Sequence, residues 1–300
     1  MTTISVVIPA RNRAAVIGRA IESVKTQSFR PMEIIVVDDG SDDDGATVAA
    51  VQAQMDGTLP IHLITLEKRG GAPRARNIGA GVAKGEWIAL LDSDDAWDPE
   101  KLREQVKLID DDVGAVFTDT LFENPGGQRT TKFAGQVIDP ADLVFTNCLG
   151  GCSAALIRRE AFDAIGGFDE SLPSCQDWDL WIKLHDHGGI RVSPLPLTLY
   201  YFDGNERISR NVQSVVKGHE SLYARIIARM DEGSARKMRR FQSFHLAQTK
   251  VYFANTARGA FAPALLNLIN PHPRTLRRSS LHLLWSGLKL KMETMGRDQR

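Results

Sequence analysis

The sequence lacks several features that would place it in other classes of protein. It has only three cysteines in 300 residues, without the paired spacing of a zinc site or the framework of a disulfide-rich domain. No apolar run approaches the roughly 20 residues that span a bilayer, and the N-terminus lacks a signal-peptide pattern. The formal net charge is zero, which argues against nucleic acid as a partner. These absences favour a globular protein of the reducing cytoplasm, either free or peripheral at the inner face of the membrane.

A glycine motif for binding dinucleotides is also missing. After the first apolar run the chain reads PARNR instead of Gly-x-Gly-x-x-Gly, which argues against a dinucleotide-dependent dehydrogenase. The hydrophobic content of 43% and the charged content of 25% are ordinary for globular proteins. The length suits one large domain, or a domain of roughly 200 residues with a helical appendage.

The first 120 residues alternate between short β-rich runs and segments with helical periodicity. This alternation predicts a parallel sheet with crossover helices, in which ligands bind beyond the carboxyl ends of the strands. Asp38 and Asp39 end the second run, and Asp92 to Asp95 end the fourth, so we expect both acidic clusters on one rim. The expected strands are residues 4–8, 33–37, 61–65, 87–91 and 114–118.

The stretch ALLDSDDAW, Ala89 to Trp97, carries three carboxylates within four positions directly after an apolar run. One interpretation is a solvated turn into a helix, with Asp98 as N-cap and Pro99 in the first helical position. That interpretation leaves the three earlier acids unexplained. The other is that Asp92 and Asp94, two apart at a strand end, offer oxygens to a divalent cation that also binds phosphates.

The later part of the chain divides into a mixed region and a helical region. A glycine-containing connection, NPGGQ, predicts a hairpin or loop, and Trp178 and Trp181 share one helix face, which favours a place in the core over stacking on a sugar. Beyond residue 211 the pattern is helical, and from residue 271 it is basic with interleaved leucines. That tail predicts either a helix on an anionic membrane or a packed helix with a basic face. Further expected elements are a strand at 153–157, a helix at 159–165 and a strand at 197–202.

Six motifs in order resemble family 2 glycosyltransferases, the inverting, nucleotide-sugar-dependent enzymes with the GT-A fold. The resemblance implies an α/β fold, a doubly wound, mostly parallel sheet flanked by helices, followed by a helical C-terminal extension. The expected domains are residues 1–210, with a nucleotide-sugar-binding half at 1–120 and an acceptor and catalytic half at 121–210, and then residues 211–300. The motifs are VVIPARNR, EIIVVDDGSDD, RGGAPRARNIG, GEWIALLDSDD, IGGFDES and QDWDLWIKL.

The resemblance also implies roles for individual residues. Asp39 would accept a hydrogen bond from the nucleobase, although Asp38 and Asp39 could instead form an acidic turn in which Ser41 caps the next helix. Asp94, helped by Asp92, would hold Mn²⁺ or Mg²⁺, with Asp95 supporting them. Asp177 would be the catalytic base, against the alternative of an ordinary acid at a helix start. The residues expected to bind the nucleotide sugar are Pro9, Arg11, Asp38, Asp39, Arg76, Asp92 and Ser93.

The chain departs from the family pattern at two positions. Gln176 replaces a glutamate that usually precedes the base, and losing that negative charge should leave Asp177 a weaker base. Phe202 occupies the place of an arginine, and no histidine follows it, which removes a third metal ligand or a diphosphate contact. The Gln-x-x-Arg-Trp pattern of processive polysaccharide synthases is absent, which favours the addition of a single sugar.

The sequence therefore predicts an inverting glycosyltransferase that moves a sugar from a nucleotide-diphospho-sugar, by preference a UDP-sugar, to a saccharide or lipid-linked acceptor. A sugar-nucleotide-binding subunit that has lost catalysis is an alternative suggested by Gln176 and Phe202. A magnesium-dependent phosphohydrolase is a weaker alternative, because its carboxylates would normally follow an early strand and one would be modified covalently.

Overall fold

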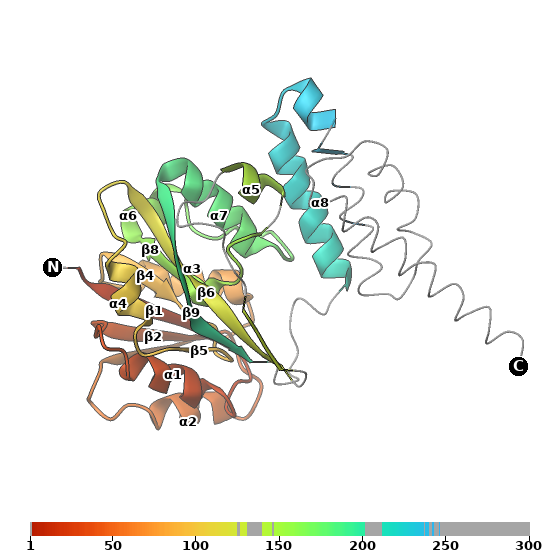
Figure 1. Cartoon of the computed structure of the whole chain (residues 1–300). Helices are drawn as coiled ribbons and strands as arrows, with labels where there is room; N and C mark the ends of the chain where they lie inside the picture. Colours follow the sequence, from red (N-terminus) through yellow and green to blue (C-terminus); the bar gives the residue numbers. More distant parts are fainter. Residues whose placement is uncertain are drawn as a thin grey trace, which may run out of the picture. The chain divides into compact units, whose positions relative to one another are not determined.

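The computed structural model describes residues 2–124, 127–130, 140–145, 147–201, 212–236, 238–239, 242 and 246 (Figure 1). The chain divides into two compact units. The first comprises residues 1–170 and 176–205, and the second comprises residues 171–175 and 206–300. Phe202 and the basic tail from residue 271 lie outside the described residues. None of the described helices is both long and apolar enough to cross a bilayer.

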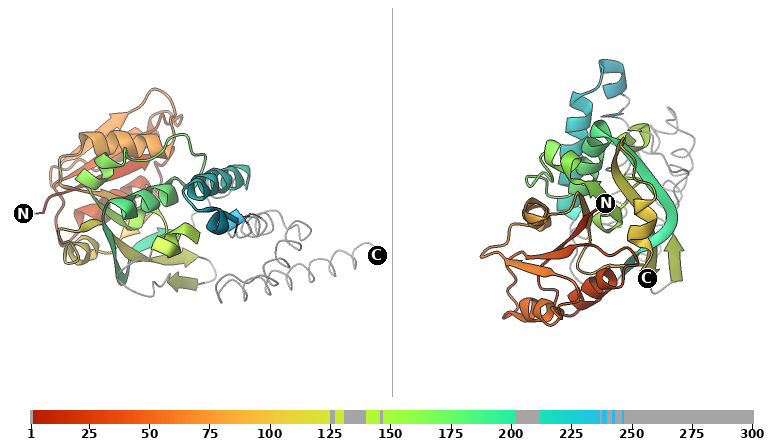
Figure 2. Two further views of the ribbon diagram at one scale, coloured as in Figure 1. Left: turned by 90° about the horizontal axis from the view of Figure 1, so that it is seen from above. Right: turned by 90° about the vertical axis from the view of Figure 1, so that its left-hand side faces the viewer.

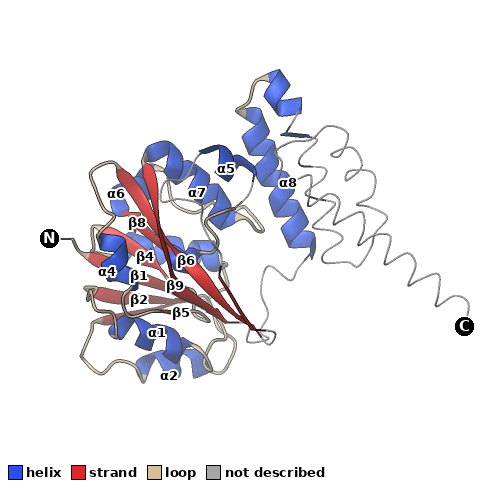
Figure 3. Ribbon diagram, in the orientation of Figure 1, coloured by secondary structure: helices blue, strands red, loops and turns tan. Residues whose placement is uncertain are grey.

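The first unit is built on a mixed sheet, which Figure 3 shows in red between its helices. The described strands follow the spatial order β3-β2-β1-β4-β8-β6-β9-β5, and β7 pairs with β6 outside this path. Their bounds are β1 Ile4–Ala10, β2 Glu33–Asp38, β3 Ile61–Thr65, β4 Trp87–Leu90, β5 Ala96–Trp97, β6 Val113–Asn124, β7 Gly127–Thr130, β8 Ala155–Arg158 and β9 Gly189–Tyr201.

The first four strands are parallel, as the sequence predicts, and helices cover both faces of this part. Because successive side chains of a strand point to opposite faces, Val7 packs with α3 while Val6 and Ile8 pack with α1 and α2. In the right-hand view of Figure 2, α1 and α2, in red and orange, lie on the opposite side from the green helices α6 and α7. The helix bounds are α1 Ile17–Lys25, α2 Ala46–Gln52, α3 Ala72–Val82, α6 Arg159–Ala164 and α7 Gln176–His187.

The second half of the sheet departs from the expected strands. The antiparallel β8 lies between β4 and β6, so the expected fifth strand does not adjoin the fourth. β8 begins at Ala155 because residues 152–154 form a 3-10 turn, η1 (Cys152–Ala154). β9 begins at Gly189, not at 197, and it follows β6 in parallel through register shifts that accommodate Pro194 and Pro196. The β6–β7 pairing confirms the expected hairpin.

The acidic stretch connects two strands of the sheet. The chain leaves β4 at Leu90, passes through Asp92 to Asp95, and returns as the short strand β5, where Ala96 pairs with Leu199 of β9. The following helix, α4 (Lys101–Val106), begins later than the predicted N-cap at Asp98 requires. Asp98 Oδ1 accepts a hydrogen bond from the Glu100 backbone nitrogen at 2.9 Å, so Asp98 closes the turn before the helix.

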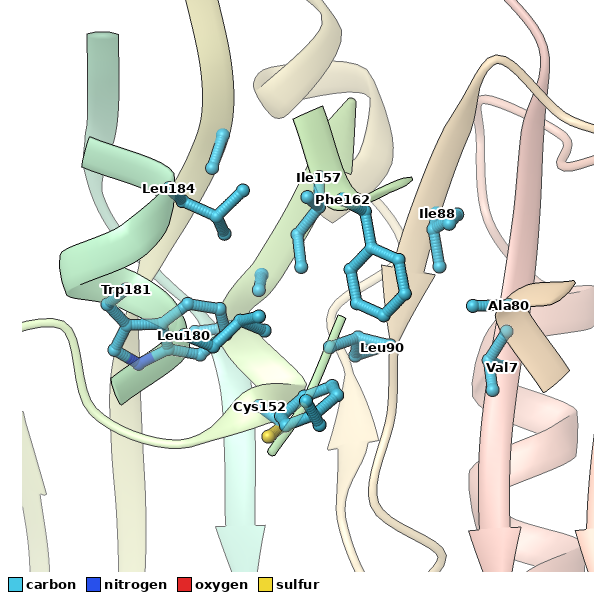
Figure 4. Close-up of a cluster of buried hydrophobic side chains, with 14 of the residues drawn as sticks. Val7, Ala80, Ile88, Leu90, Cys152, Ile157, Phe162, Leu180, Trp181 and Leu184 are labelled. Carbon is cyan, nitrogen blue, oxygen red and sulfur yellow. The ribbon is translucent and has the colours of Figure 1, made fainter. Parts of the chain in front are cut away.

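One hydrophobic core lies along one face of the sheet and connects α7 with α3 (Figure 4). Trp178 and Trp181 are 2% and 0% exposed, which confirms their prediction as core residues. The Trp181 ring meets Phe117 of β6 edge-on, with ring centroids 4.7 Å apart. α5 (Pro140–Phe145) joins this layer, since the Trp178 indole donates to the Leu143 carbonyl at 2.6 Å. This packing fixes the start of α7, where Asp177 lies.

In the second unit, the described residues include the long helix α8 (Val212–Ala228). Ser174 donates a hydrogen bond to the Ser214 carbonyl at 3.0 Å, and the Cys175 sulfur lies 3.3 Å from Nδ1 of His219. Residues 171–175 therefore belong to this unit although they precede α7 in sequence. The boundary expected at residue 210 stays a prediction.

Candidate active site

Arg76 lies at the centre of the candidate site. Its Nη2 donates to Asp92 Oδ1 at 2.5 Å, and the guanidinium faces the Phe168 ring at 5.4 Å. Burial lowers the pKa of Arg76, but Cys152, Asp92 and Asp177 raise it by more, so the net shift is upward and the side chain stays charged. The structure therefore brings three predicted site residues, Arg76, Asp92 and Asp177, into electrostatic contact.

The acidic loop after β4 is held from inside by Ser153. Ser153 Oγ donates to Asp95 Oδ2 at 2.6 Å and accepts from the Asp92 backbone nitrogen at 3.0 Å. The Trp97 indole donates to the Ser153 carbonyl at 2.8 Å. Asp95 is buried at 3% exposure, which fits its expected supporting place behind Asp92. Sequence reasoning missed Ser153, whose only signal was its place in the small-residue segment NCLGGCSAAL.

Arg19 of α1 holds the outer side of the same loop. Its Nη2 donates to the Asp94 carbonyl oxygen at 2.6 Å, and its guanidinium stacks 3.9 Å from the Tyr201 ring. The contact fixes the Asp94 backbone and uses neither carboxylate oxygen of Asp94, which is half-buried. Ser93 is buried at 5% exposure. Arg19 was not predicted, because nothing in an amphipathic helix shows which carbonyl a long side chain reaches.

Asp39 is buried at the end of β2 and organises the entrance to α3. Its Oδ1 accepts from the Gly70 backbone nitrogen at 2.6 Å, and its Oδ2 accepts from the Gly71 nitrogen at 2.7 Å. Gly71 has φ +92°, a conformation that favours glycine. Each carboxylate oxygen keeps a further lone pair for a ligand. The expected contact of Asp39 with a nucleobase stays a prediction, and its contact with the Gly70–Gly71 turn was not foreseen.

Asp38 and Ser41 lie in one hydrogen-bond chain beside Asp39. Asp38 is 1% exposed and accepts from the Ser41 hydroxyl, which accepts in turn from the Asn12 backbone nitrogen at 2.9 Å. Ser41 therefore does not cap the next helix, as the alternative interpretation required. Gly45 is the N-cap residue of α2, and Asp43 Oδ2 accepts from the Thr47 nitrogen in the first turn at 3.0 Å.

The two remaining predicted residues come from the end of β1 and the loop after it. Pro9 is buried in β1 and pairs with Val37 of β2. Arg11 is partly exposed, and its Nη2 lies 3.0 Å from Asp42 Oδ2. Both residues are thus near Asp38 and Asp39, as expected, and their contact with a nucleotide stays a prediction.

Asp177 is held at the start of α7 by two hydrogen bonds. Its Oδ1 accepts from the Trp178 backbone nitrogen at 2.8 Å, and its Oδ2 accepts from Asn147 Nδ2 at 3.0 Å. Burial raises the pKa of Asp177, the Trp178 bond and Arg76 oppose that shift, and Asp92 adds to it. Burial thus raises the pKa of Asp177, which is the direction in which the negative charge of a preceding glutamate would also have shifted it. Such a shift suits a general base.

The acidic loop offers two carboxylates to a cation. Within the part of the chain that the structure describes, no three Asp, Glu, His or Cys side chains gather into a metal-binding set. Asp92 is 30% exposed at its side chain, with one oxygen bonded to Arg76. A Mg²⁺ or Mn²⁺ ion commonly takes one or two carboxylates and completes its shell with water and substrate phosphates. Asp92 and Asp94 fit that donor set.

Comparison with known families decides the class of the protein. The sequence model described as Glycosyl transferase family 2 matches residues 5–166, more than half of the chain. The chain belongs to this family. The family resemblance drawn from the six motifs is thereby confirmed.

Two curated relatives illustrate how far the similarity extends. An uncharacterized glycosyltransferase of Haemophilus influenzae is 30% identical over 60% of this chain and 61% of the relative. The succinoglycan biosynthesis protein ExoO of Rhizobium meliloti is 42% identical over 39% of this chain and 33% of that protein. The chain therefore spans less than two thirds of the length of either relative.

Solved structures confirm the fold. TarS of S. aureus, residues 1–349 in complex with UDP-GlcNAc, superposes with a TM-score of 0.66 at 19% identity, covering 96% of this chain and 81% of that one. The mannosyltransferase PcManGT from Pyrobaculum calidifontis, in complex with GDP-Man and Mn²⁺, gives a TM-score of 0.61 at 18% identity, covering 98% and 87%. The chain has the GT-A fold.

Proposed function

We propose that this glycosyltransferase transfers one sugar, with inversion at the anomeric carbon, from a UDP-sugar to a hydroxyl of a saccharide or lipid-linked acceptor. The observation that carries the proposal is the position of Arg76, which bonds Asp92 and acts electrostatically on Asp177. Asp92, proposed for the diphosphate end, and Asp177, proposed for the acceptor, thus both interact with the buried guanidinium of Arg76. The bound UDP-GlcNAc of TarS, and the succinoglycan biosynthesis of ExoO, support a nucleotide-sugar donor and a saccharide product.

The donor half of the proposal rests on the carboxyl edge of the parallel strands. Asp39 would receive the nucleobase, with Asp38, Pro9 and Arg11 beside it. The diphosphate would lie over the acidic loop, where Ser93 and the cation ligands meet. This order agrees with the rule that ligands of open α/β sheets bind beyond the carboxyl ends of the strands.

Asp94 and Asp92 would hold Mn²⁺ or Mg²⁺ in this proposal. When bound, the cation would neutralise charge on the diphosphate and so make the nucleotide a better leaving group. Arg76, which stays charged, would add positive charge at the same end of the site. The bound Mn²⁺ of PcManGT supports a divalent ion, without deciding between the two metals.

Asp177 would act as the general base. As the acceptor oxygen attacks the anomeric carbon, its proton passes to the Asp177 carboxylate, and the bond from that carbon to the phosphate oxygen breaks. The electron pair leaves with the nucleoside diphosphate, and attack from the opposite face inverts the configuration. The upward pKa shift from burial places this carboxylate closer to the ideal strength for such a base.

The test combines donor binding with turnover. Asp177→Asn should bind UDP-GlcNAc with Mn²⁺ like the parent in calorimetry, while release of UDP falls by about 100-fold or more. Asp179→Asn is the matched control, because Asp179 lies on the same helix and pairs with Lys183 at 2.6 Å. GDP-mannose is run in parallel as the second donor. Undiminished turnover by Asp177→Asn would contradict the base assignment.

The metal assignment has its own variant. Asp94→Ala should abolish the dependence of donor binding on Mn²⁺, since the remaining carboxylate at Asp92 is shared with Arg76. A binding isotherm equal to that of the parent would refute the assignment. If the parent binds both donors and turns over neither, the protein is instead a binding subunit that has lost catalysis.

A further inference from the structure

Asn147 lies between the candidate base and the loop before η1, and its contacts fix the direction of its amide. Nδ2 donates to Asp177 Oδ2 at 3.0 Å and to the Gly150 carbonyl at 3.1 Å. Both partners are acceptors, so the nitrogen must face them and the oxygen must point away. The amide thus uses both of its hydrogens on one carboxylate and one carbonyl.

The opposite side of the same amide is left open. Oδ1 of Asn147 is buried and, among the described residues, has no hydrogen-bond partner. Buried polar atoms are paired in the great majority of cases, because an unpaired one costs the free energy of its lost hydration. An amide kept only to stabilise the fold would be expected to satisfy its oxygen. Such exceptions concentrate at functional sites, where position takes precedence over stability.

Asn77 shows the contrast within the same unit. Its Nδ2 donates to the Phe168 carbonyl at 2.9 Å, and its Oδ1 accepts from the Phe168 backbone nitrogen at 2.9 Å. Its Nδ2 also donates to Glu170 Oε1 at 2.9 Å, so both ends of that amide are satisfied, which is the arrangement of a structural residue. Asn147 differs because its oxygen has no partner among the described residues, while its nitrogen holds the carboxylate that is proposed to receive a proton.

We propose that Asn147 is a positioning residue, whose amide nitrogen holds Oδ2 of Asp177 in the orientation that receives the acceptor's proton. The inference rests on the proposed role of Asp177 and extends it. With Oδ1 tied to the Trp178 nitrogen and Oδ2 tied to Asn147, the carboxylate cannot rotate freely. A general base works only within hydrogen-bond reach and correct alignment, so loosening one oxygen lowers kcat without weakening the donor complex.

Two substitutions separate positioning from simple packing. Asn147→Leu keeps the approximate size of the side chain but cannot donate to Asp177, whereas Asn147→Ala removes both size and donor. Positioning by the hydrogen bond predicts that both variants lose kcat for release of UDP from UDP-GlcNAc by about 10- to 100-fold. The KM for the donor should stay within about twofold of the parent. Asn77→Ala, the matched control, should keep kcat, although its melting temperature falls.

Each outcome decides one claim. Parent-like kcat in Asn147→Leu would overturn the inference while leaving the proposed function intact, provided that Asp177→Asn is inactive. Full activity of Asp177→Asn would instead overturn the proposed function. A crystal structure of Asn147→Ala needs no turnover at all, and it should show the Asp177 carboxylate rotated from its present orientation. An unmoved carboxylate would also overturn the inference.

Discussion

Arg76 shows how a single residue sets the chemistry of this site. It is 7% exposed on α3, and it interacts with carboxylates that come from the β4–β5 loop and from α7. An opposite charge nearby favours the ionised form of a carboxylate, so Arg76 restrains the upward pKa shift that burial imposes on Asp177. The residue therefore lowers the pKa of the proposed base as well as binding Asp92.

This balance predicts a pH dependence. A general base must be ionised, so turnover should be present above the pKa of Asp177 and lost as the pH falls through it. Because burial raises that pKa, the acid limb of the pH profile, where turnover is lost, should lie above the ordinary aspartate pKa of 3.8. Arg76→Met removes the opposing charge and should move the limb to still higher pH, by about one unit or more. The measurement is the pH profile of kcat for release of UDP, with both proteins in Mn²⁺.

A control separates this effect from general damage. Arg74→Met changes the other arginine on the first turns of α3, and it should leave the acid limb where the parent has it. If Arg76→Met loses activity equally at every pH, its charge does not act on the base, and Arg76 serves only the donor.

Other residues of the site could not have been found from the sequence. Carboxylates at strand ends and at a helix start carry a readable pattern, and the structure brings Asp92 near Asp177 as predicted. Asn147 and Ser153 lie in the small-residue segment NCLGGCSAAL, which resembles the acceptor-side segment of the family, but neither they nor Arg19 carry a pattern that names a partner. Each acts through a residue distant in sequence, as when Ser153 bonds Asp95, which is 58 residues away. Side chains that bond to backbone atoms or to buried acids follow from the completed fold alone.

The helix α4 carries an unusual element of this fold, a fully buried lysine. Lys101 donates to Gln105 Oε1 at 2.9 Å, and its ammonium nitrogen lies 4.2 Å from the centre of the Trp97 ring. Gln105 in turn donates to the carbonyls of Val116 and Ala154. Lys101 and Gln105 therefore connect α4 to β6 and η1, next to β5, the strand that follows the acidic loop.

Burial lowers the pKa of Lys101 well below its usual 10.5, so the free energy of unfolding should depend on pH. Between the folded and unfolded pKa values the unfolded chain binds more protons, so the free energy of unfolding should rise with pH there. This gain is limited to about 1.4 kcal/mol per pH unit. Lys101→Met should lose this rise in the pH range just below 10.5, measured by urea unfolding at several pH values.

The exposed Lys107 supplies the comparison. Lys107→Met, at a side chain that is 58% exposed, should leave the pH slope of the parent unchanged. A constant stability difference between the parent and Lys101→Met across this pH range would show that Lys101 does not titrate differently on folding. The loss of the Gln105 contact does not interfere, because it lowers stability by the same amount at every pH.

Helices and strands were predictable where the local hydrophobic periodicity of the sequence matches the burial of the segment in the fold. The parallel strands β1, β2 and β4 are buried apolar runs and β3 is a partly exposed edge strand, and all four were expected. The insertion of β8 between β4 and β6 depends on pairing between distant segments, which no local pattern records. β9 was expected only at residues 197–202, after its two prolines, whereas register shifts allow the strand to begin at Gly189 and to continue past them.

At the scale of the whole molecule, the family match covers most residues of the candidate site but ends at residue 166. Asp177 and Asn147 therefore fall on either side of its end, yet they are in contact through a hydrogen bond. The fold continues the family architecture through β9, as the superposition with TarS over 96% of the chain indicates. The catalytic arrangement thus depends on segments that the family model does not include.

The basic tail gives the last prediction, which rests on sequence because residues 271–300 lie outside the described part. In that segment, arginines and lysines outnumber acids and alternate with leucines, which is typical of a helix on an anionic membrane. Each basic side chain near such a surface contributes about 1 kcal/mol. In the full-length chain, replacing five of them with glutamine should therefore nearly abolish sedimentation with phosphatidylglycerol vesicles. The five are Arg274, Arg277, Arg278, Lys289 and Lys291.

Neutral phosphatidylcholine vesicles provide the comparison, and the parent should not sediment with them at physiological salt. Added salt should weaken binding to the anionic vesicles, because screening acts on exposed charges. If the parent does not sediment with anionic vesicles, the tail is a packed helix with a solvated basic face. The acceptor of this transferase would then be sought among water-soluble saccharides, because a lipid-linked acceptor requires an enzyme that reaches the membrane.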